Sequence, residues 1–369
     1  MSTVRIGVVG LGLMGAGHAG TIASGKIKGL ELTAVVSSDP AKRARFASAR
    51  GFTTTEEMIA SGLVDAVLIA TPHYSHTTIG IQALKAGLHV LVEKPISVHK
   101  ADAEKLIAAH TNKKKIFAAI LNQRTDPYFQ KIRQLVQSGE LGAVRRVQWT
   151  ITDWFRTHAY YSASAWRATW AGEGGGVLLN QCLHNLDLFQ WLFGMPERVT
   201  GFCNFGRYHP IEAEDDVTAH FGYADGSHAT LITSTGEAPG TNRLEVATER
   251  GRIVYENDKL TLTRNEVPMS EFSRTSKEAF AKPATCEIAI PLSGHGGQHV
   301  EILQNFADAI LDGKPLIAPA AEGIRSIELA NAIVLSAWEK KPVDFPLNAK
   351  TYERTLKQKI VATKTTRSR

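Results

Sequence analysis

The chain has 369 residues, of which 43% are apolar and 21% charged, and its formal net charge is +6. This composition is ordinary for a soluble globular protein and leaves room for two domains. The basic residues gather in local runs and form no stripe interleaved with aromatic side chains, so nucleic acid is not expected as a partner.

The cysteines and the apolar runs indicate where the protein works. Cys182, Cys203 and Cys286 are odd in number and too far apart for a zinc knuckle, which favours a reducing cytoplasm. The N-terminus enters an apolar strand without a signal-peptide pattern, and no apolar run reaches the roughly 20 residues that a membrane span needs. We therefore expect a soluble cytoplasmic protein with no membrane partner.

The first predicted strand, residues 4–9, is followed at once by the sequence GLGLMG at residues 10–15. A helix and a second strand, residues 32–36, come next, so the glycines lie inside a βαβ unit. In that context the glycine motif is typical of a dinucleotide site, whereas outside it the motif is a weak signal.

Each glycine of the motif has a separate task. Gly10 permits the tight turn, Gly12 lets the backbone approach a pyrophosphate, and Gly15 allows the helix to pack closely on the strand. The phosphates are expected at the helix N-terminus, beside Leu13 and Met14, where free N–H groups favour anions.

The residues after the second strand leave the cofactor undecided between NAD and NADP. Ser37 and Ser38 stand where an acidic side chain usually binds the adenosine ribose of NAD. Without that acid, Lys42 or Arg43 has access to the extra phosphate of NADP, but Asp39 remains able to serve NAD.

Strands and helices then alternate up to residue 122, which predicts a parallel, doubly wound Rossmann sheet in a first domain of residues 1–122. The further strands are expected at 64–70, 89–92 and 116–120, and the further helices at 77–86 and 100–110.

The strand at 89–92 runs directly into Glu93, Lys94 and Pro95. Because charged residues are costly to bury, such a strand should deliver Glu93 and Lys94 to the carboxyl edge of the sheet, where ligands bind. Pro95 biases Lys94 towards an extended backbone. A salt-bridged surface turn would give the same pattern, so this segment alone leaves both interpretations open.

Residues 123–369 have a different character and predict an α+β domain on a largely antiparallel open sheet, which makes the whole chain α/β in class. Strands are expected at 144–155, 198–205, 217–223, 227–234, 243–247 and 251–255, and helices at 127–138, 298–311 and 322–339. The last two helices are expected to pack back against both domains. Residues 257–291 show no clear pattern.

A glycine-rich loop and an amphipathic helix are predicted across residues 172–194. Asn180, His184 and Asp187 are spaced i, i+4 and i+7, which places them on one face of that helix. A histidine at such a position is often structural, but the preceding glycines and the polar neighbour one turn earlier favour a functional role.

Four motifs in this order, GLGLMG, TPHYSH, AGLHVLVEKP and GGGVLLNQCLHNLD, resemble the Gfo/Idh/MocA family of nicotinamide-dependent oxidoreductases. The resemblance covers most of the chain. It implies an N-terminal Rossmann domain, a C-terminal open sheet that often mediates homo-oligomers, and a carbohydrate or polyol as the small-molecule substrate.

The resemblance also implies roles for particular residues. Lys94 corresponds to the catalytic lysine and His184 to the acid/base, although their roles could be exchanged. Many members have aspartate where this chain has Asn180, which can orient the substrate or the imidazole only by hydrogen bonds. The expected cofactor-binding residues are Gly10, Gly12, Leu13, Met14, Gly15, Ser37, Ser38, Arg43, Thr71, Pro72, His76, Glu93, Lys94 and Gln123.

Aromatic residues and arginines are dense between Asp153 and Trp170. Trp154, Tyr160 and Trp166 follow no helical or strand period, and rings beside arginines suit the apolar face and hydroxyls of a sugar. The alternative is a subunit interface, for which the same residue types are suited.

The remaining candidates for substrate binding are Arg124, which otherwise braces the interdomain hinge, and His295. His295 and His299 have the i, i+4 spacing of a metal site, but without a third ligand nearby no metal is expected. The full expected substrate set is Lys94, Arg124, Trp154, Tyr160, Trp166, Asn180, His184 and His295.

Together these features predict an NAD(P)-dependent dehydrogenase that oxidises a secondary ring hydroxyl of a sugar or glycoside to a keto-sugar. The alternatives are an inositol dehydrogenase, an NAD-dependent glycosidase, and a cofactor-binding sensor without catalysis. Retention of both Lys94 and His184 argues against the sensor. Lys94 and His184 are expected to converge over one dinucleotide.

Overall fold

A computed structural model describes residues 3–367, and the side chains of residues 3–363, as two compact units. The first unit comprises the chain up to Thr125 together with residues 171–174 and 296–328. The second comprises residues 126–170, 175–295 and the chain from Leu329 onward. The segment 296–328, which was predicted in the second domain, thus belongs to the first unit. Arg369, the last of the basic residues, lies outside the described range.

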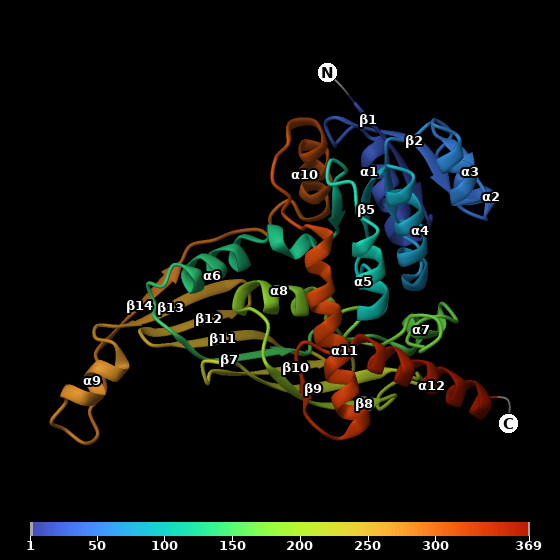
Figure 1. The fold of residues 1–369 in the computed structure, drawn as a ribbon. Coiled ribbons are helices and arrows are strands. Elements are labelled where there is room, and N and C mark those ends of the chain that lie inside the picture. Colours follow the sequence, from blue (N-terminus) through green and yellow to red (C-terminus); the bar gives the residue numbers. More distant parts are fainter. Residues whose placement is uncertain (1–2, 368–369) are drawn as a thin grey trace. The chain divides into compact units, whose positions relative to one another are not determined.

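The first unit contains a six-stranded sheet in the order β3-β2-β1-β4-β5-β6, and every strand pair in it is parallel. Figure 1 labels β1, β2 and β5 of this sheet. The strands are β1 Val4–Val9, β2 Leu30–Val36, β3 Arg50–Phe52, β4 Ala66–Ile69, β5 His89–Val92 and β6 Phe117–Ala119. The direction of the order reverses between β1 and β4, which makes the carboxyl edge of these two strands a topological switch point. The predicted Rossmann fold is confirmed.

Short apolar runs form this sheet because helices cover both of its faces. All four residues of β4 are buried, as are the last three of β5. The helices of this unit are α1 Leu13–Ala23, α2 Pro40–Ala44, α3 Thr55–Ala60, α4 His73–Lys85, α5 Lys100–Ala108 and α10 Gln298–Asp312, with 3₁₀ turns η1 Asn122–Thr125 and η2 Ala320–Glu322. Packing of α10 against this unit brings Phe306 and Leu303 into the same apolar core as β1.

His89 at the start of β5 joins this strand to the segment that enters β6. Its Nδ1 accepts a hydrogen bond from the N–H of Ile116 at 2.9 Å. Burial, with a smaller contribution from the charge of Lys115, lowers the pKa of His89 to about 4. The fold therefore binds the neutral imidazole, because a proton on Nδ1 would remove the acceptor.

We expect this histidine to make the first unit less stable in mild acid. Its folded pKa lies below the unfolded value of about 6.5, so its contribution is present above that pH and is lost as the pH falls towards 4. With allowance for partial exposure, the loss should be about 1–2 kcal/mol. His89→Asn offers an oxygen acceptor that does not titrate, and should show a flatter pH dependence in urea unfolding between pH 5 and 7.5. Equal slopes for the two proteins would contradict this assignment.

The second unit contains a nine-stranded sheet in the order β14-β13-β12-β11-β7-β10-β9-β8-β15. Only the neighbours β7 and β10 are parallel, so the prediction of a largely antiparallel sheet is confirmed. The strands are β7 Val144–Ile151, β8 Arg198–Phe205, β9 Glu214–Gly222, β10 His228–Ser234, β11 Asn242–Thr248, β12 Gly251–Glu256, β13 Lys259–Asn265, β14 Thr285–Ile290 and β15 Val343–Asp344. The unassigned segment 257–291 holds β13, β14 and the helix α9 Met269–Thr275.

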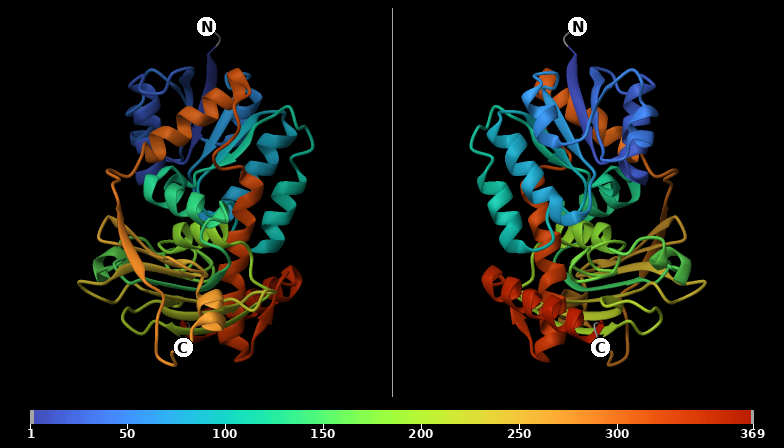
Figure 2. Two further views of the ribbon diagram at one scale, coloured as in Figure 1. Left: turned by 90° about the vertical axis from the view of Figure 1, so that its left-hand side faces the viewer. Right: turned by 90° about the vertical axis from the view of Figure 1, so that its right-hand side faces the viewer.

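Helices α6 Pro127–Gln137 and α8 Leu183–Phe193 lie on one face of this sheet, as both views in Figure 2 show. Aromatic contacts hold them there. The ring centroid of Phe129 in α6 is 5.7 Å from that of Trp149, and Phe189 in α8 is 5.0 Å from Phe221. The opposite face is polar and carries ion pairs such as Arg146–Glu245.

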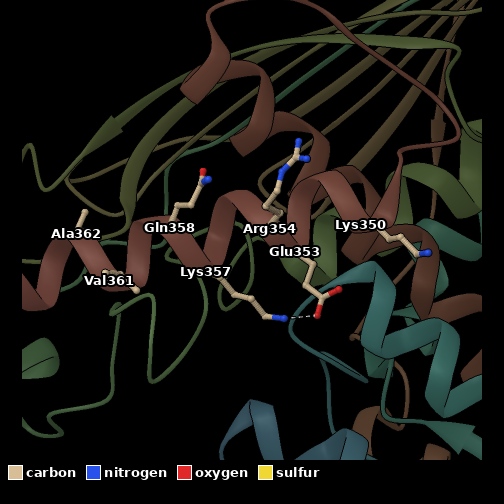
Figure 3. A pocket seen from close by; sticks show the side chains of 7 residues that line it. All are labelled: Lys350, Glu353, Arg354, Lys357, Gln358, Val361 and Ala362. Carbon is tan, nitrogen blue, oxygen red and sulfur yellow. Dashed lines mark hydrogen bonds and ion pairs between the residues drawn. The ribbon is translucent and has the colours of Figure 1, made fainter.

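The remaining helices of the chain are α7 His158–Ser162, α11 Gly323–Glu339, within which the two units divide, and α12 Ala349–Arg367. Helix α12 was not predicted. It is fixed by Tyr352, whose ring stacks on Trp338 at 5.7 Å. A second side of α12 lines a hollow with Lys350, Glu353, Arg354, Lys357, Gln358, Val361 and Ala362 (Figure 3). None of the described helices is both long and apolar enough to traverse a bilayer.

Candidate functional site

The glycine turn between β1 and α1 has no room for side chains at two of its three glycines. Gly10 has a φ of +89°, and a Cβ there would lie 2.7 Å from the carbonyl oxygen of Ala70. A Cβ on Gly15 would lie 1.8 Å from the carbonyl oxygen of Gly10. Gly12, in contrast, faces open space. Helix α1 has no acidic residue in its first turn, so its N-terminal N–H groups are suited to an anion.

Gly15→Ala is expected to weaken binding of the dinucleotide by tenfold or more and to destabilise the first unit by about 1–3 kcal/mol, because the new methyl group collides with backbone. The matched control is Gly17→Ala in the same helix, where a Cβ meets no atom within 4 Å. That change should instead stabilise the protein by about 0.5–1 kcal/mol. NADH fluorescence titration and thermal unfolding measure both effects, and similar behaviour of the two variants would refute the tight turn.

A cavity of about 430 Å³ opens at the carboxyl ends of β1, β2 and β4, all within the first unit. Serine and threonine side chains dominate its lining, and its only acidic residue is Glu56, which accepts a hydrogen bond from Gln82. The lining residues are Val9, Gly10, Val36, Ser37, Ser38, Thr53, Thr54, Thr55, Glu56, Thr71, Ser75, Thr78, Ile79 and Gln82.

Two predicted cofactor-binding residues of the first unit carry buried oxygens without a hydrogen-bond partner. They are Oγ1 of Thr71 and Oε1 of Gln123. Buried polar atoms are rarely left in this condition unless a ligand or water completes them. The glycine turn, the strand-edge cavity and these two oxygens together fit a dinucleotide.

The groups that could select between NAD and NADP are held by local contacts. Asp39 caps α2, since its Oδ1 accepts the N–H groups of Ala41 at 2.9 Å and Lys42 at 3.4 Å. Arg43 donates from Nη1 to the carbonyl oxygen of Ser37. The carboxylate of Asp39 is therefore occupied by the N-terminus of α2, while the guanidinium of Arg43 lies beside Ser37. The cofactor remains NAD or NADP.

Glu93 is fixed from a helix distant in sequence. It is buried, and its Oε1 lies 2.6 Å from Nε2 of His18 in α1, while its Oε2 accepts the N–H of Lys94 at 3.1 Å. Burial acts to raise the pKa of this carboxyl, but the hydrogen bond and charge of His18 outweigh it and the pKa is lowered. The sequence offered no signal for His18, because nothing local marks a contact over 75 residues.

His76 holds the other side of Lys94. Its Nδ1 lies 2.7 Å from the carbonyl oxygen of Pro95, and its Nε2 lies 2.8 Å from that of Thr71. Both ring nitrogens of this buried histidine therefore face backbone, which favours a positioning role over direct contact with the cofactor. The backbone of Lys94 is thus fixed by a neighbour on each side.

Arg124 is placed differently from the expectation that it binds substrate. Its side chain is 1% exposed. Its Nη1 lies 2.5 Å from Oε2 of Glu322 and 3.3 Å from the carbonyl oxygen of Ile317. These contacts tie η1 to the segment 296–328, so the side chain of Arg124 joins two segments of the first unit.

In the second unit, α8 begins only at Leu183, so Asn180 precedes the helix and does not share a helical face with His184 and Asp187. The cause is Glu214, which is fully buried at the start of β9. Its Oε1 accepts the N–H groups of Gly176 at 2.9 Å and Leu178 at 3.1 Å, and this draws the preceding segment into turns.

The remaining two residues of the expected helical face also differ in their surroundings. Asp187 is buried and accepts a hydrogen bond from Gln190 at 3.1 Å. His184, in the first turn of α8, is only partly buried. Of the two, His184 is the more exposed.

Tyr160 is the centre of a hydrogen-bond network that includes Asn180, another predicted substrate residue. Its hydroxyl accepts hydrogen bonds from Nη1 of Arg167 at 2.8 Å, Nε2 of Gln181 at 3.1 Å and Nδ2 of Asn180 at 3.3 Å. Trp154 joins α8 through a hydrogen bond from its Nε1 to Asn185 at 3.2 Å. The aromatic segment and the turn before His184 therefore form one network.

The network around Tyr160 extends to Trp166 by stacking. The guanidinium of Arg167 lies 5.0 Å from the centroid of the Trp166 ring.

His295 is engaged elsewhere in the second unit. Its Nδ1 lies 2.9 Å from Oδ2 of Asp126 and its Nε2 lies 3.7 Å from Asp258, and the bond to Asp126 raises its pKa. His299 belongs to the first unit, where its ring is 5.4 Å from that of His18. The described residues contain no group of three or more side chains suited to hold a metal ion.

A Rossmann sheet with a glycine cradle, together with a second unit on an open sheet, defines the chain as a dinucleotide-binding protein in class. The profile "Oxidoreductase family, NAD-binding Rossmann fold" matches residues 4–120, and "GFO/IDH/MocA C-terminal domain" matches residues 129–254. The chain belongs to the Gfo/Idh/MocA family.

Characterised relatives and solved structures agree with this assignment. An inositol 2-dehydrogenase of Rhizobium meliloti is 25% identical over 92% of this chain and 99% of its own length. A levoglucosan dehydrogenase of Pseudarthrobacter phenanthrenivorans is 24% identical over 94% of this chain and 99% of its own length. The WlbA dehydrogenase of Chromobacterium violaceum, solved with NADH and UDP-GlcNAcA, is 25% identical with a TM-score of 0.81, and the match covers 94% and 97% of the two chains.

Proposed function

We propose that the protein is an NAD(P)-dependent dehydrogenase that oxidises a secondary ring hydroxyl of a sugar or glycoside to a keto-sugar. The observation that carries the proposal is the pairing of a glycine cradle with the fixed Lys94 in the first unit. Support comes from His184 in the second unit and from relatives named as dehydrogenases of inositol and levoglucosan.

In this proposal the bound nicotinamide supplies the acceptor for a hydride, and the residues of the chain handle one proton. The imidazole of His184 takes the proton of the substrate hydroxyl as a general base. The ammonium of Lys94 stabilises the negative charge that develops on that oxygen. Asn180 orients the substrate or the imidazole through hydrogen bonds, since an amide cannot supply a carboxylate charge.

The aromatic network supplies the rest of the proposed substrate site. Trp154, Tyr160 and Trp166 present rings suited to the apolar face of a sugar, and two of them are already anchored by hydrogen bonds. On the cofactor side, the turn at residues 10–15, Ser37, Ser38, Thr71 and Gln123 are the proposed contacts.

Inositol is the second candidate substrate, because the relatives named inositol 2-dehydrogenase include one that matches 92% of this chain. A cyclic polyol presents the same secondary ring hydroxyl, so the proposed chemistry would be unchanged. An NAD-dependent glycosidase differs in its product, since the glycosidic bond would be cleaved.

A substrate panel tests the proposal. The purified protein is incubated with NAD or NADP and with glucosides, free sugars and inositols, and reduced nicotinamide is followed by its absorbance. Oxidation of a sugar with retention of the glycosidic bond is the expected result. A cleaved bond would support the glycosidase, and the absence of any reaction despite cofactor binding would support the sensor.

We also propose that the protein works in the cytoplasm as a homo-oligomer that associates through the open face of the nine-stranded sheet. Phe202 in β8 is 65% exposed and is paired with Thr218, which is exposed as well. The three cysteines are free, as suits a reducing compartment. Light scattering coupled to gel filtration tests the assembly, and a Phe202→Asp variant should lower the measured mass.

A further inference from the structure

Two arginines of the second unit rest on one tyrosine ring. The guanidinium carbons of Arg156 and Arg167 lie 5.2 and 4.4 Å from the ring centroid of Tyr160. Arg156 donates to the carbonyl oxygen of Phe155 at 2.8 Å and lies near enough to Asp153 to act on its pKa. For Arg167, no ion pair is found with any described residue of its own unit.

Other arginines of this unit that have a structural role form ion pairs with carboxylates. Arg207 lies over the ring of Tyr208 at 5.2 Å, in the same kind of stack, but its Nη1 is 3.3 Å from a carboxylate oxygen of Asp216. Arg243 pairs with both Glu245 and Glu256. Arg167 therefore shares the stack on a tyrosine ring with Arg207, but among the described residues of its unit it has no carboxylate partner.

The hydrogen bonds of Arg167 are also incomplete. Its Nη1 donates to the hydroxyl of Tyr160 at 2.8 Å, whereas its Nε is buried with no acceptor in reach. A guanidinium presents five N–H donors in a rigid fork, which matches two oxygens of a carboxylate or phosphate. A buried donor on a charged group is costly to leave unpaired, so an oxyanion is the group that would complete this site.

Space for such a group exists beside Arg167. A cavity of about 330 Å³ is lined by Arg167, His158, Ser162, Ser164 and Thr169 among others, and no acidic residue lines it. The hydroxyls of Ser162 and Thr169 donate to backbone carbonyls, so the guanidinium is the principal donor that remains. The volume lies in the range of small-ligand pockets.

The cavity is connected to the proposed reaction site through Tyr160. The hydroxyl that accepts from Arg167 also accepts from Asn180 and Gln181, in the segment that leads into α8. His184 follows Asn180 by four residues. The hydroxyl of Tyr160 therefore links Arg167, and any group bound to it, to the segment that leads to His184, the proposed base.

We propose that Arg167 binds an oxyanion, either a carboxylate or a phosphate, carried by the sugar substrate, so that acidic or phosphorylated sugars are preferred over neutral ones. This inference rests on the proposed dehydrogenase function, and it names the class of substrate. Arg167 is then a specificity residue, with Tyr160 as the platform that orients its fork.

The test compares neutral sugars with their anionic forms, beginning with glucose, glucuronate and glucose 6-phosphate. The expected kcat/KM of the wild-type protein is roughly tenfold or more higher for at least one anionic form, and which form it is separates the carboxylate from the phosphate. Arg167→Gln should lower kcat/KM for that sugar by about 10–100-fold and for the neutral sugar by less than about threefold. Arg207→Gln, the matched arginine-on-tyrosine control, should change neither.

Calorimetric binding to the protein saturated with NADH decides the inference independently of turnover. Glucuronate or glucose 6-phosphate should bind more tightly than glucose, and Arg167→Gln should remove the difference while Arg207→Gln keeps it. Equal losses for neutral and anionic sugars would make Arg167 only a clamp for Tyr160 and overturn the proposal, as would equal binding of all three sugars. If the anionic sugar binds through Arg167 but no sugar is oxidised, the proposed function fails and the anion site stands.

Discussion

Replacing His184 by alanine is expected to lower turnover by about 10²–10⁴-fold, the loss typical of removing a general acid/base, while affinity for the nicotinamide cofactor stays within about twofold. The two effects should separate because His184 lies in the first turn of α8 in the second unit, whereas the glycine cradle belongs to the first. Stopped-flow or steady-state assays give turnover, and NADH fluorescence gives the affinity.

Two further variants make the result for His184 specific. His184→Gln retains a hydrogen-bonding side chain but cannot exchange a proton near neutral pH, so it should lose as much activity as alanine and lose the acid limb of the pH–rate profile. His220→Ala changes an exposed histidine on the open face of the sheet, away from the proposed reacting groups, and should leave turnover per subunit and cofactor affinity unchanged. A parallel fall in cofactor affinity and turnover for His184→Ala would make this histidine structural.

Lys94→Met should reduce kcat by about 10²–10³-fold, because methionine retains much of the length of lysine but lacks the charge that stabilises an alkoxide. The backbone at this position is held by Glu93 and by His76 through Pro95, so the substitution should leave the fold intact. Single-turnover kinetics separate the loss in the chemical step from any loss in substrate binding.

Lys94→Arg and Lys85→Ala are the controls for this position. Arginine keeps the positive charge in a different shape and should recover part of kcat. Lys85 lies in the last turn of α4, where it is exposed, and its removal should have no effect. If Lys94→Met binds and oxidises every substrate as well as the wild type, the lysine has no part in the reaction and the sensor alternative gains support.

The Rossmann half was predictable because its strands are buried on both faces and therefore appear as short apolar runs. The predicted strand at 89–92 coincides with β5, and the first strand with β1. In the second unit the prediction failed at β14, where that burial is missing. Five of the six residues of β14 are exposed at the edge of the sheet, so no alternation marks it.

The candidate site was predictable where its residues are adjacent in sequence, as in the glycine turn and the Glu93–Lys94 pair. It was not predictable where one side chain acts on a distant segment. Glu214 accepts hydrogen bonds from the turn before His184, although it lies 36 to 38 residues further along the chain. These hydrogen bonds explain why Asn180 lies in a turn and not on the predicted helical face. Arg124 was a similar case, because its partner Glu322 is 198 residues away.

The imidazole of His76 links the end of β4 to the loop after β5, since it lies within 2.8 Å of a carbonyl oxygen on each. Two loops that would otherwise fluctuate independently are therefore constrained to move together. The entropy of ordering the lysine-bearing loop is lost once, when the chain folds, and no longer opposes each encounter with a sugar. If Lys94 takes its proposed part in the reaction, weakening that link should slow turnover through a broader distribution of ammonium positions, even though the lysine is still present.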